Sequence, residues 1–318
     1  MKPLSDQIEI RRYADSLKQT WDRFVPTTKN RSFLFLRDYM DYHRERFSDH
    51  SLLFLVNRRL LACLPAHVAD GKLCSHLGLT FGGLLLHRDI RLRQVQGIVR
   101  ALCGHLRTHG LTAALYRPMP HPYHEFPAEE DIASLHAHGA TVVEARATLC
   151  LRAGPPDRLA RDRRRELCRD EVGALTIRRS TDFRTFMRHC ARYLARRFGS
   201  EPVHSEDEMA LLASRFPDNI QLYVIERGAE LLAGQILYRH GSCAKLQYGA
   251  PASDFIEEGI MTRLDTHLLT EVLPAGSWLD FGHSHDPAGR FNEGVHQFKE
   301  SMGARTVTLA TYNLPAEP

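Results

Sequence analysis

The chain lacks the cysteine spacings that mark zinc ribbons and disulfide frameworks. Its seven cysteines are odd in number and scattered, and none is spaced as Cys-x-x-Cys, so we expect reduced thiols. It also lacks any run of about 18 uncharged apolar residues. Residues 1–21 contain no apolar core of signal-peptide length. We therefore expect a cytoplasmic protein without a membrane span.

A strong excess of one charge is absent as well. The 42 lysines and arginines against 38 acidic residues give a formal net charge of +4. This balance is too mild to indicate a nucleic-acid-binding protein, but it is compatible with a small anionic acceptor. With 318 residues, 43% of them hydrophobic, the chain has material for two domains of typical size. The sequence leaves the oligomeric state open.

Periodicity and turn residues divide the chain into two halves with the same order of elements. Each half begins with a helix and three strands, followed by a helix, a strand, a second helix and a last strand. In the first half we expect helix 31–50, strands 51–56, 60–68 and 72–79, helix 92–109, strand 111–117, helix 127–139 and strand 141–151. In the second half we expect helix 182–198, strands 220–226, 230–238 and 242–248, helix 257–273, strand 277–282, helix 290–303 and strand 304–312.

This order predicts an α/β protein of two tandem modules, each a mixed, mostly antiparallel sheet flanked by helices. The expected limits are residues 1–153 for the first module and 174–318 for the second, which carries the main active cleft. Residues 154–173 form a connecting basic helix in which arginines alternate with carboxylates. A solvated connector is the simpler interpretation of that pattern, and contact with phosphates is the alternative.

The segment Trp278–Arg305, WLDFGHSHDPAGRFNEGVHQFKESMGAR, gathers histidines, carboxylates and a lysine. Its polar residues resemble metal ligands at first sight, but they have no known metal spacing and lie around a loop with proline and glycine, so we expect no metal. Those residues are His283, His285, Asp286, Glu293 and His296. The Asp-Phe-Gly tripeptide at 280–282 lacks the glycine-rich and His-Arg-Asp loops that a kinase requires.

A meander, a helix, the strand SWLDFG and the helix containing QFKESMG resemble the second half of the GNAT acyltransferase superfamily in its duplicated, FemABX-like form. The stretches NRSFLFLRDYMDYHRERFSDHSLLF and LDFGHSHDPAGRFNEGVHQFKESMGAR are similar to GNAT-like proteins of bacterial surface-polysaccharide gene clusters. The resemblance covers residues 21–312. It implies N-acyltransfer, with acetyl-CoA as donor and an amino group on a nucleotide-linked sugar or other cell-surface glycan precursor as acceptor. Aminoacyl transfer from charged tRNA and a non-catalytic binding module are the alternatives.

The same resemblance places the donor at the helix after the second meander. GNAT domains that use acetyl-CoA usually carry Arg/Gln-x-x-Gly-x-Gly/Ala there, where backbone N–H groups hold the pyrophosphate. Here the chain reads Ile-Glu-Glu-Gly-Ile-Met over 256–261, which implies Gly259, Ile260 and Met261 as donor-binding residues. Glu257 and Glu258 would repel a diphosphate. The donor therefore stays open between an acyl-CoA, a carrier-bound acyl group and an aminoacyl-tRNA.

Four residues are candidates for catalysis. Lys299 is the first choice as an electrostatic stabiliser of a developing oxyanion, and a surface lysine is its alternative. Asp280 and His283 end a predicted interior strand, where a carboxylate beside an imidazole suits a general base. A loop-capping carboxylate and a solvent-facing histidine are their alternatives. Tyr248 is a candidate acid for the leaving group, with aromatic packing as its alternative.

Acceptor-binding candidates lie at an early helix, after the third strand of the first half, and in the second module. Helical spacing brings four of them toward one face, glycines after the strand permit close backbone approach to a ligand, and ordinary packing is the competing interpretation. The set is Tyr39, Tyr42, His43, Arg46, His76, Gly78, Thr80, Gln247 and Asn292.

Overall fold

The computed structural model describes residues 8–155, 159–168, 175–251, 259–285 and 289–317. The chain divides into two compact units: residues 1–146 with 308–318, and residues 147–307. The strands β9 (Thr141–Arg152) and β15 (Arg305–Pro315) each contain one of the two boundaries. The last strand thus contributes its final residues to the first unit, whereas the sequence prediction runs the second module to residue 318.

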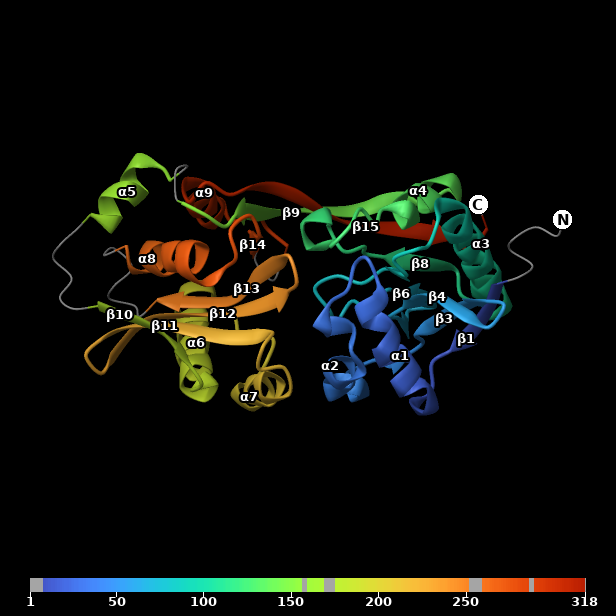
Figure 1. The fold of residues 1–318 in the computed structure, drawn as a ribbon, viewed down its shortest axis with the longest axis horizontal. Helices are drawn as coiled ribbons and strands as arrows, with labels where there is room; N and C mark the ends of the chain where they lie inside the picture. The colour runs from blue at the N-terminus through green and yellow to red at the C-terminus, as the bar shows by residue number, and fades with distance from the viewer. Residues whose placement is uncertain (1–7, 156–158, 169–174, 252–258, 286–288, 318) are drawn as a thin grey trace. The chain divides into compact units, whose positions relative to one another are not determined.

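The first unit has two sheets, β1-β3-β4-β7 and a set in the order β15-β8-β6-β5-β2. Its strands are β1 (Ile8–Arg12), β2 (Ser48–Asp49), β3 (Leu52–Val56), β4 (Arg59–Leu64), β5 (His67–Ala69), β6 (Lys72–Cys74), β7 (Leu85–Leu86) and β8 (Ala113–Tyr116). Its helices are α1 (Lys18–Phe24), α2 (Arg37–Met40), α3 (Leu92–Thr108) and α4 (Glu130–Ala137). In Figure 1 these elements run from blue to green.

Helix α3 holds the core of the first unit because its apolar residues recur at helical spacing. Val95, Ile98, Leu102 and Leu106 are fully buried and pack in one cluster with Leu52 and other strand residues. Gly110 follows the helix with φ +66°, a left-handed conformation that glycine adopts without strain. The end of α3 predicted from this glycine is confirmed.

Two predictions for the first unit are wrong, and the expected strand 72–79 ends early, at Cys74. The expected strand 60–68 is split, because Pro65 has no N–H to continue the ladder, and its parts β4 and β5 belong to different sheets. The expected helix 31–50 is a series of short turns: the 3₁₀ segment Phe33–Phe35, α2, and the 3₁₀ segment Asp41–Arg46. Asp22 accepts the N–H of Arg37 at 2.8 Å and starts α2, and His43 leaves the helical region.

The second unit has one sheet in the order β10-β11-β12-β13-β14-β9. Its strands are β10 (Leu175–Ser180), β11 (Ile220–Arg227), β12 (Glu230–His240), β13 (Cys243–Pro251) and β14 (Trp278–His283). Its helices are α5 (Arg161–Leu167), α6 (Phe183–Phe198), α7 (Glu206–Arg215), α8 (Ile260–His267), which continues as a π-helical turn over Leu268–Val272, and α9 (Glu293–Ser301). Helix α8 contacts β11 and β12 on one face of the sheet, and α6 contacts β13 on the other (Figure 1).

The predicted meander of the second unit is confirmed. Strands β11, β12 and β13 are antiparallel neighbours, and Gly228 and Gly241 occupy the left-handed region in the turns between them. Ile260 and Leu264 of α8 are fully buried against Ile225 and Leu232. One core cluster of this unit therefore lies under α8, and a second one contains Leu279 and Phe281 of β14.

Candidate active site

Strands β13 and β14 pair over only three positions and then part. The parallel register runs from Cys243 opposite Trp278 to Lys245 opposite Asp280. Beyond this point β13 continues to Pro251 without β14 as its partner. No described strand pairs with residues 246–251 of β13 on that side, which is the arrangement an extended ligand needs to add itself as a strand.

A β-bulge sits in the same stretch of β13. Ile236 lies opposite Tyr248, but the next residue of β12 lies opposite Leu246, so Gln247 is the extra residue. Its side-chain Oε1 is buried with no hydrogen-bond partner among the described residues. The Tyr248 hydroxyl lies 2.7 Å from Nδ1 of His204 and accepts the His204 N–H at 3.1 Å. The sequence analysis missed His204, which lies in a loop far from β13 in the chain.

Asp280 is a buried carboxylate that fixes the end of β14. Its Oδ1 accepts hydrogen bonds from Thr148 Oγ1 at 2.5 Å and from the N–H of Gly282 at 2.7 Å. Gly282 has φ +74°, so the chain turns here in a conformation that suits glycine. Burial and, next, the neighbouring Asp280 charge raise the pKa of the Cys150 thiol, which remains protonated.

Lys299 is buried beneath this turn. Its ammonium donates to the carbonyl oxygens of Gly282 and His283, both at 2.9 Å, and to Ser284 Oγ at 3.2 Å. These contacts occupy all three N–H donors that a lysine has. Burial, followed by the nearby charge of Lys245, lowers the pKa of Lys299 to about 8. The geometry makes Lys299 the residue that holds the loop after β14.

The other candidates of this segment are closer to solvent. The His283 side chain is exposed, and its Nδ1 accepts the N–H of His285 at 3.3 Å. Asn292 caps α9, because its Oδ1 accepts the N–H of Val295 at 3.1 Å. A cap role accounts for Asn292 without an acceptor, whereas the part of His283 in catalysis stays a prediction.

The start of α8, where the sequence places the donor residues, is covered by α5. Gly259 has φ +69°, and a Cβ atom there would lie 2.6 Å from Cβ of Glu166. Glu166 accepts a hydrogen bond from Thr262 Oγ1 at 2.6 Å and pairs with Arg163 at 2.7 Å. Ile260 is buried in the core, so it could contribute only its backbone to a donor. The residues before Gly259, with the two predicted repelling glutamates, lie outside the described residues.

A buried polar pair beneath β12 was also missed by the sequence analysis. Gln235 Nε2 donates to Oδ1 of Asp265 at 2.6 Å, and Oδ2 of that carboxyl has no partner among the described residues. Burial raises the pKa of Asp265 to about 7. The Asp265 carboxyl therefore changes between its neutral and its charged form near physiological pH.

Four acceptor candidates of the first unit are joined by three ring contacts. Tyr39 is buried with its ring 5.6 Å from that of Tyr42, and the Tyr42 ring stacks on His43 at 4.2 Å. His76 lies 5.6 Å from His43, and Phe47 packs between them and fills the space beside Gly78. Burial, then the neighbouring histidines, lower the pKa of His76 to about 3, so it is neutral. Arg46 is exposed and Thr80 half-buried.

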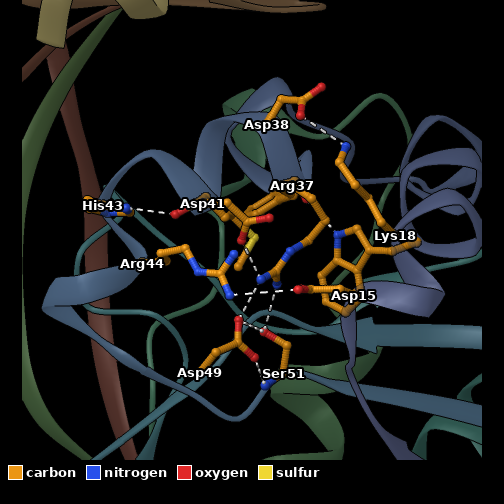
Figure 2. A network of polar contacts seen from close by, with 12 residues as sticks. Asp15, Lys18, Arg37, Asp38, Asp41, His43, Arg44, Asp49 and Ser51 are labelled. Atoms are coloured by element: carbon orange, nitrogen blue, oxygen red, sulfur yellow. Dashed lines mark hydrogen bonds and ion pairs between the residues drawn. The ribbon is translucent and has the colours of Figure 1, made fainter.

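A network of polar contacts in the first unit surrounds Arg37 (Figure 2). Its guanidinium lies 3.8 Å from the centre of the Tyr13 ring and bonds Asp41 at 2.6 Å and Asp49 at 2.7 Å. These residues, with Arg44 and others, line a cavity of about 240 Å³. Because both carboxylates already pair with the buried guanidinium, the network first serves to hold α2 against β2.

Across the described ranges, no group of three histidine, cysteine or acidic side chains could hold a metal ion. No helix in those ranges is both long and apolar enough to cross a bilayer.

Both a family model and solved structures match this chain. Residues 157–299 match the family model for an acetyltransferase (GNAT) domain, which identifies this part of the chain as an acyltransferase domain. No curated protein matches the sequence.

Solved structures match along nearly the whole chain. The structure of FemX aligns with a TM-score of 0.66 at 11% identity, over 96% of this chain and 97% of its own. The C-terminal domain of a putative lysylphosphatidylglycerol synthetase from Agrobacterium fabrum aligns with a TM-score of 0.59 at 10% identity, over 93% and 91%. A tandem GNAT protein from the clavulanic acid biosynthesis pathway aligns with a TM-score of 0.52 at 13% identity, over 98% and 99%. These likenesses establish the predicted fold, two tandem GNAT-like modules.

Proposed function

We propose that residues 157–299, a GNAT acetyltransferase domain, make the protein an N-acyltransferase that moves an acetyl group from acetyl-CoA to an amino group. The proposed acceptor is a nucleotide-linked sugar or another cell-surface glycan precursor. Because such donors and acceptors are cytoplasmic metabolites, we propose the cytoplasm as its location.

The parting of β13 and β14 is the observation that carries this proposal. The amide groups of an extended acyl donor can pair with the free backbone edge of β13, which would bring the acyl carbon toward the bulge at Gln247. The same place gathers the groups that amide formation needs, namely the Tyr248–His204 pair and the turn that Asp280 and Lys299 hold.

In the proposed reaction the acceptor nitrogen forms a bond to the acyl carbon, and the carbon–sulfur bond of the thioester breaks. The amine loses a proton, for which the exposed imidazole of His283 is the proposed base. The departing thiolate takes a proton, for which the Tyr248 hydroxyl is the proposed acid, with His204 Nδ1 at 2.7 Å to replace that proton. Lys299 acts through the loop that it holds.

One contact favours a second candidate function, aminoacyl transfer from charged tRNA. The Glu166 carboxylate lies at the start of α8, where the diphosphate of acetyl-CoA would meet the positive end of the helix dipole. An anion of the chain therefore competes with a donor that carries a diphosphate at this position. An aminoacyl ester has no diphosphate to place there.

Thiol release separates the two candidates. The protein is incubated with acetyl-CoA and a panel of nucleotide-linked amino sugars, and free CoA is measured with a thiol-reactive chromophore. Release that requires both substrates supports acetyl transfer. No release, together with an RNase-sensitive transfer of an amino acid from charged tRNA to the same acceptors, supports the second candidate. Absence of both reactions and of donor binding in calorimetry would make the protein a non-catalytic binding module.

A further inference from the structure

Lys245 of β13 carries an ammonium group that has neither a hydrogen bond nor an ion pair with any described residue. Its side chain is half-buried, and its partner in the parallel register is Asp280, the last pair before β13 and β14 separate. The chain has six lysines in all, so a lysine within a strand is a rare choice here. A partly buried ammonium whose three donors have no protein partner can bind an anionic oxygen.

Lys245 and Lys299 lie on two sides of the same glycine. A Cβ atom on Gly282 would be 3.1 Å from Nζ of Lys245, while Nζ of Lys299 lies 2.9 Å from the Gly282 carbonyl oxygen. The two lysines differ in what their donors do. Lys299 uses all three on the loop, whereas those of Lys245 remain available to a ligand.

The Asp280 carboxylate, opposite Lys245 in the register, does not neutralise both the Lys245 and the Lys299 ammonium groups. Oδ1 of Asp280 accepts hydrogen bonds from Thr148 Oγ1 and from the Gly282 N–H. Lys299 also interacts electrostatically with the Asp265 carboxyl, whereas Lys245 forms no hydrogen bond or ion pair with a described residue, so its positive charge is available where the strands part. Such a place, partly shielded from water, favours a negatively charged oxygen.

We propose that Lys245 binds a negatively charged oxygen of the reactants in the proposed acyl transfer, on which this inference rests. A negatively charged oxygen can come from two groups of the reactants. One is the oxygen of the acyl carbonyl, which becomes negative when the amine adds and returns to a carbonyl when the thiolate leaves. The other is a phosphate of a nucleotide-linked acceptor.

Steady-state kinetics of K245M, K245R and the control K72M test the proposal, with Lys72 of β6 as another half-buried lysine. Circular dichroism first checks that each variant is folded. We expect K245M to lose at least about 100-fold in kcat/KM, and K245R to keep most of it. If the oxygen is that of the carbonyl, kcat falls and KM is unchanged. If it is the acceptor's phosphate, KM rises only for phosphorylated acceptors. Wild-type kcat and KM in K245M would overturn the proposal.

A second measurement needs no turnover, so it separates failure of this inference from failure of the proposed function. The native protein is acetylated with a small amine-reactive ester, with and without inorganic diphosphate, and the lysines are quantified by peptide mass spectrometry. We expect Lys245 to react faster than Lys299 and to be protected at least threefold by diphosphate, while Lys72 is unaffected. Labelling of Lys245 that diphosphate leaves unchanged, in a protein without turnover, rejects the inference.

Discussion

Because the pKa of Lys299 is lowered, the free energy of unfolding of the second unit should change with pH in the alkaline range. Burial lowers this pKa from 10.5 to about 8. Between these values the unfolded chain keeps the lysine proton and the folded chain has lost it, so the free energy of unfolding rises with pH. The shift corresponds to about 3 kcal/mol at 1.36 kcal/mol per unit, gained between pH 8 and 10.5. Lys299→Met removes the titrating group and should remove this gain.

Urea denaturation of both proteins from pH 7 to 10.5 measures the effect. A Trp21→Phe background leaves Trp278 of β14 as the only tryptophan, so fluorescence follows the second unit. The wild-type minus Lys299→Met difference in unfolding free energy should rise by about 3 kcal/mol over this range. The same difference for Lys72→Met should stay flat. A flat difference for Lys299→Met as well would mean that its ammonium reaches water, and the argument that it holds the loop from a buried position would fail.

Three further predictions concern other contacts. Removing the carboxylate at the start of α8 in Glu166→Ala should tighten acetyl-CoA binding about tenfold in calorimetry, whereas Asp162→Ala, exposed on the same helix, should not change it; equal affinities would contradict the competition. Arg37→Met leaves two carboxylates without their guanidinium and should lower the free energy of unfolding by about 3 kcal/mol. The exposed Arg44, whose contact with a carboxylate is 3.7 Å, should cost less than about 0.5 kcal/mol when replaced by Met, and similar losses for both would refute the buried-network argument. Gly282→Ala forces φ +74° on alanine and should cost about 1 kcal/mol in urea denaturation with a further loss of kcat; an unchanged unfolding curve would show that the turn relaxes.

Local chemistry made much of the fold predictable. Left-handed glycines after α3 and in the turns of β11–β13 match the helix ends and hairpins that the sequence indicates, because glycine is the residue that these conformations favour. The prediction failed where a local pattern competed with distant contacts. The periodicity of residues 31–50 is helical, but Asp22 fixes the start of α2 and the chain then turns toward the Arg37 network.

Some residues of the candidate site could likewise be predicted from the sequence, whereas others could not. The sequence by itself located the segment from β14 to α9 and singled out Lys299, since a strand, a loop and a helix that follow one another carry that information. Lys245, His204 and Glu166 became candidates only in the folded unit. Each lies far along the chain from the group that it contacts or faces, in a strand, a loop and a separate helix. A single sequence encodes spacing along the chain, whereas unpaired charge and covered helix ends result from packing between distant segments.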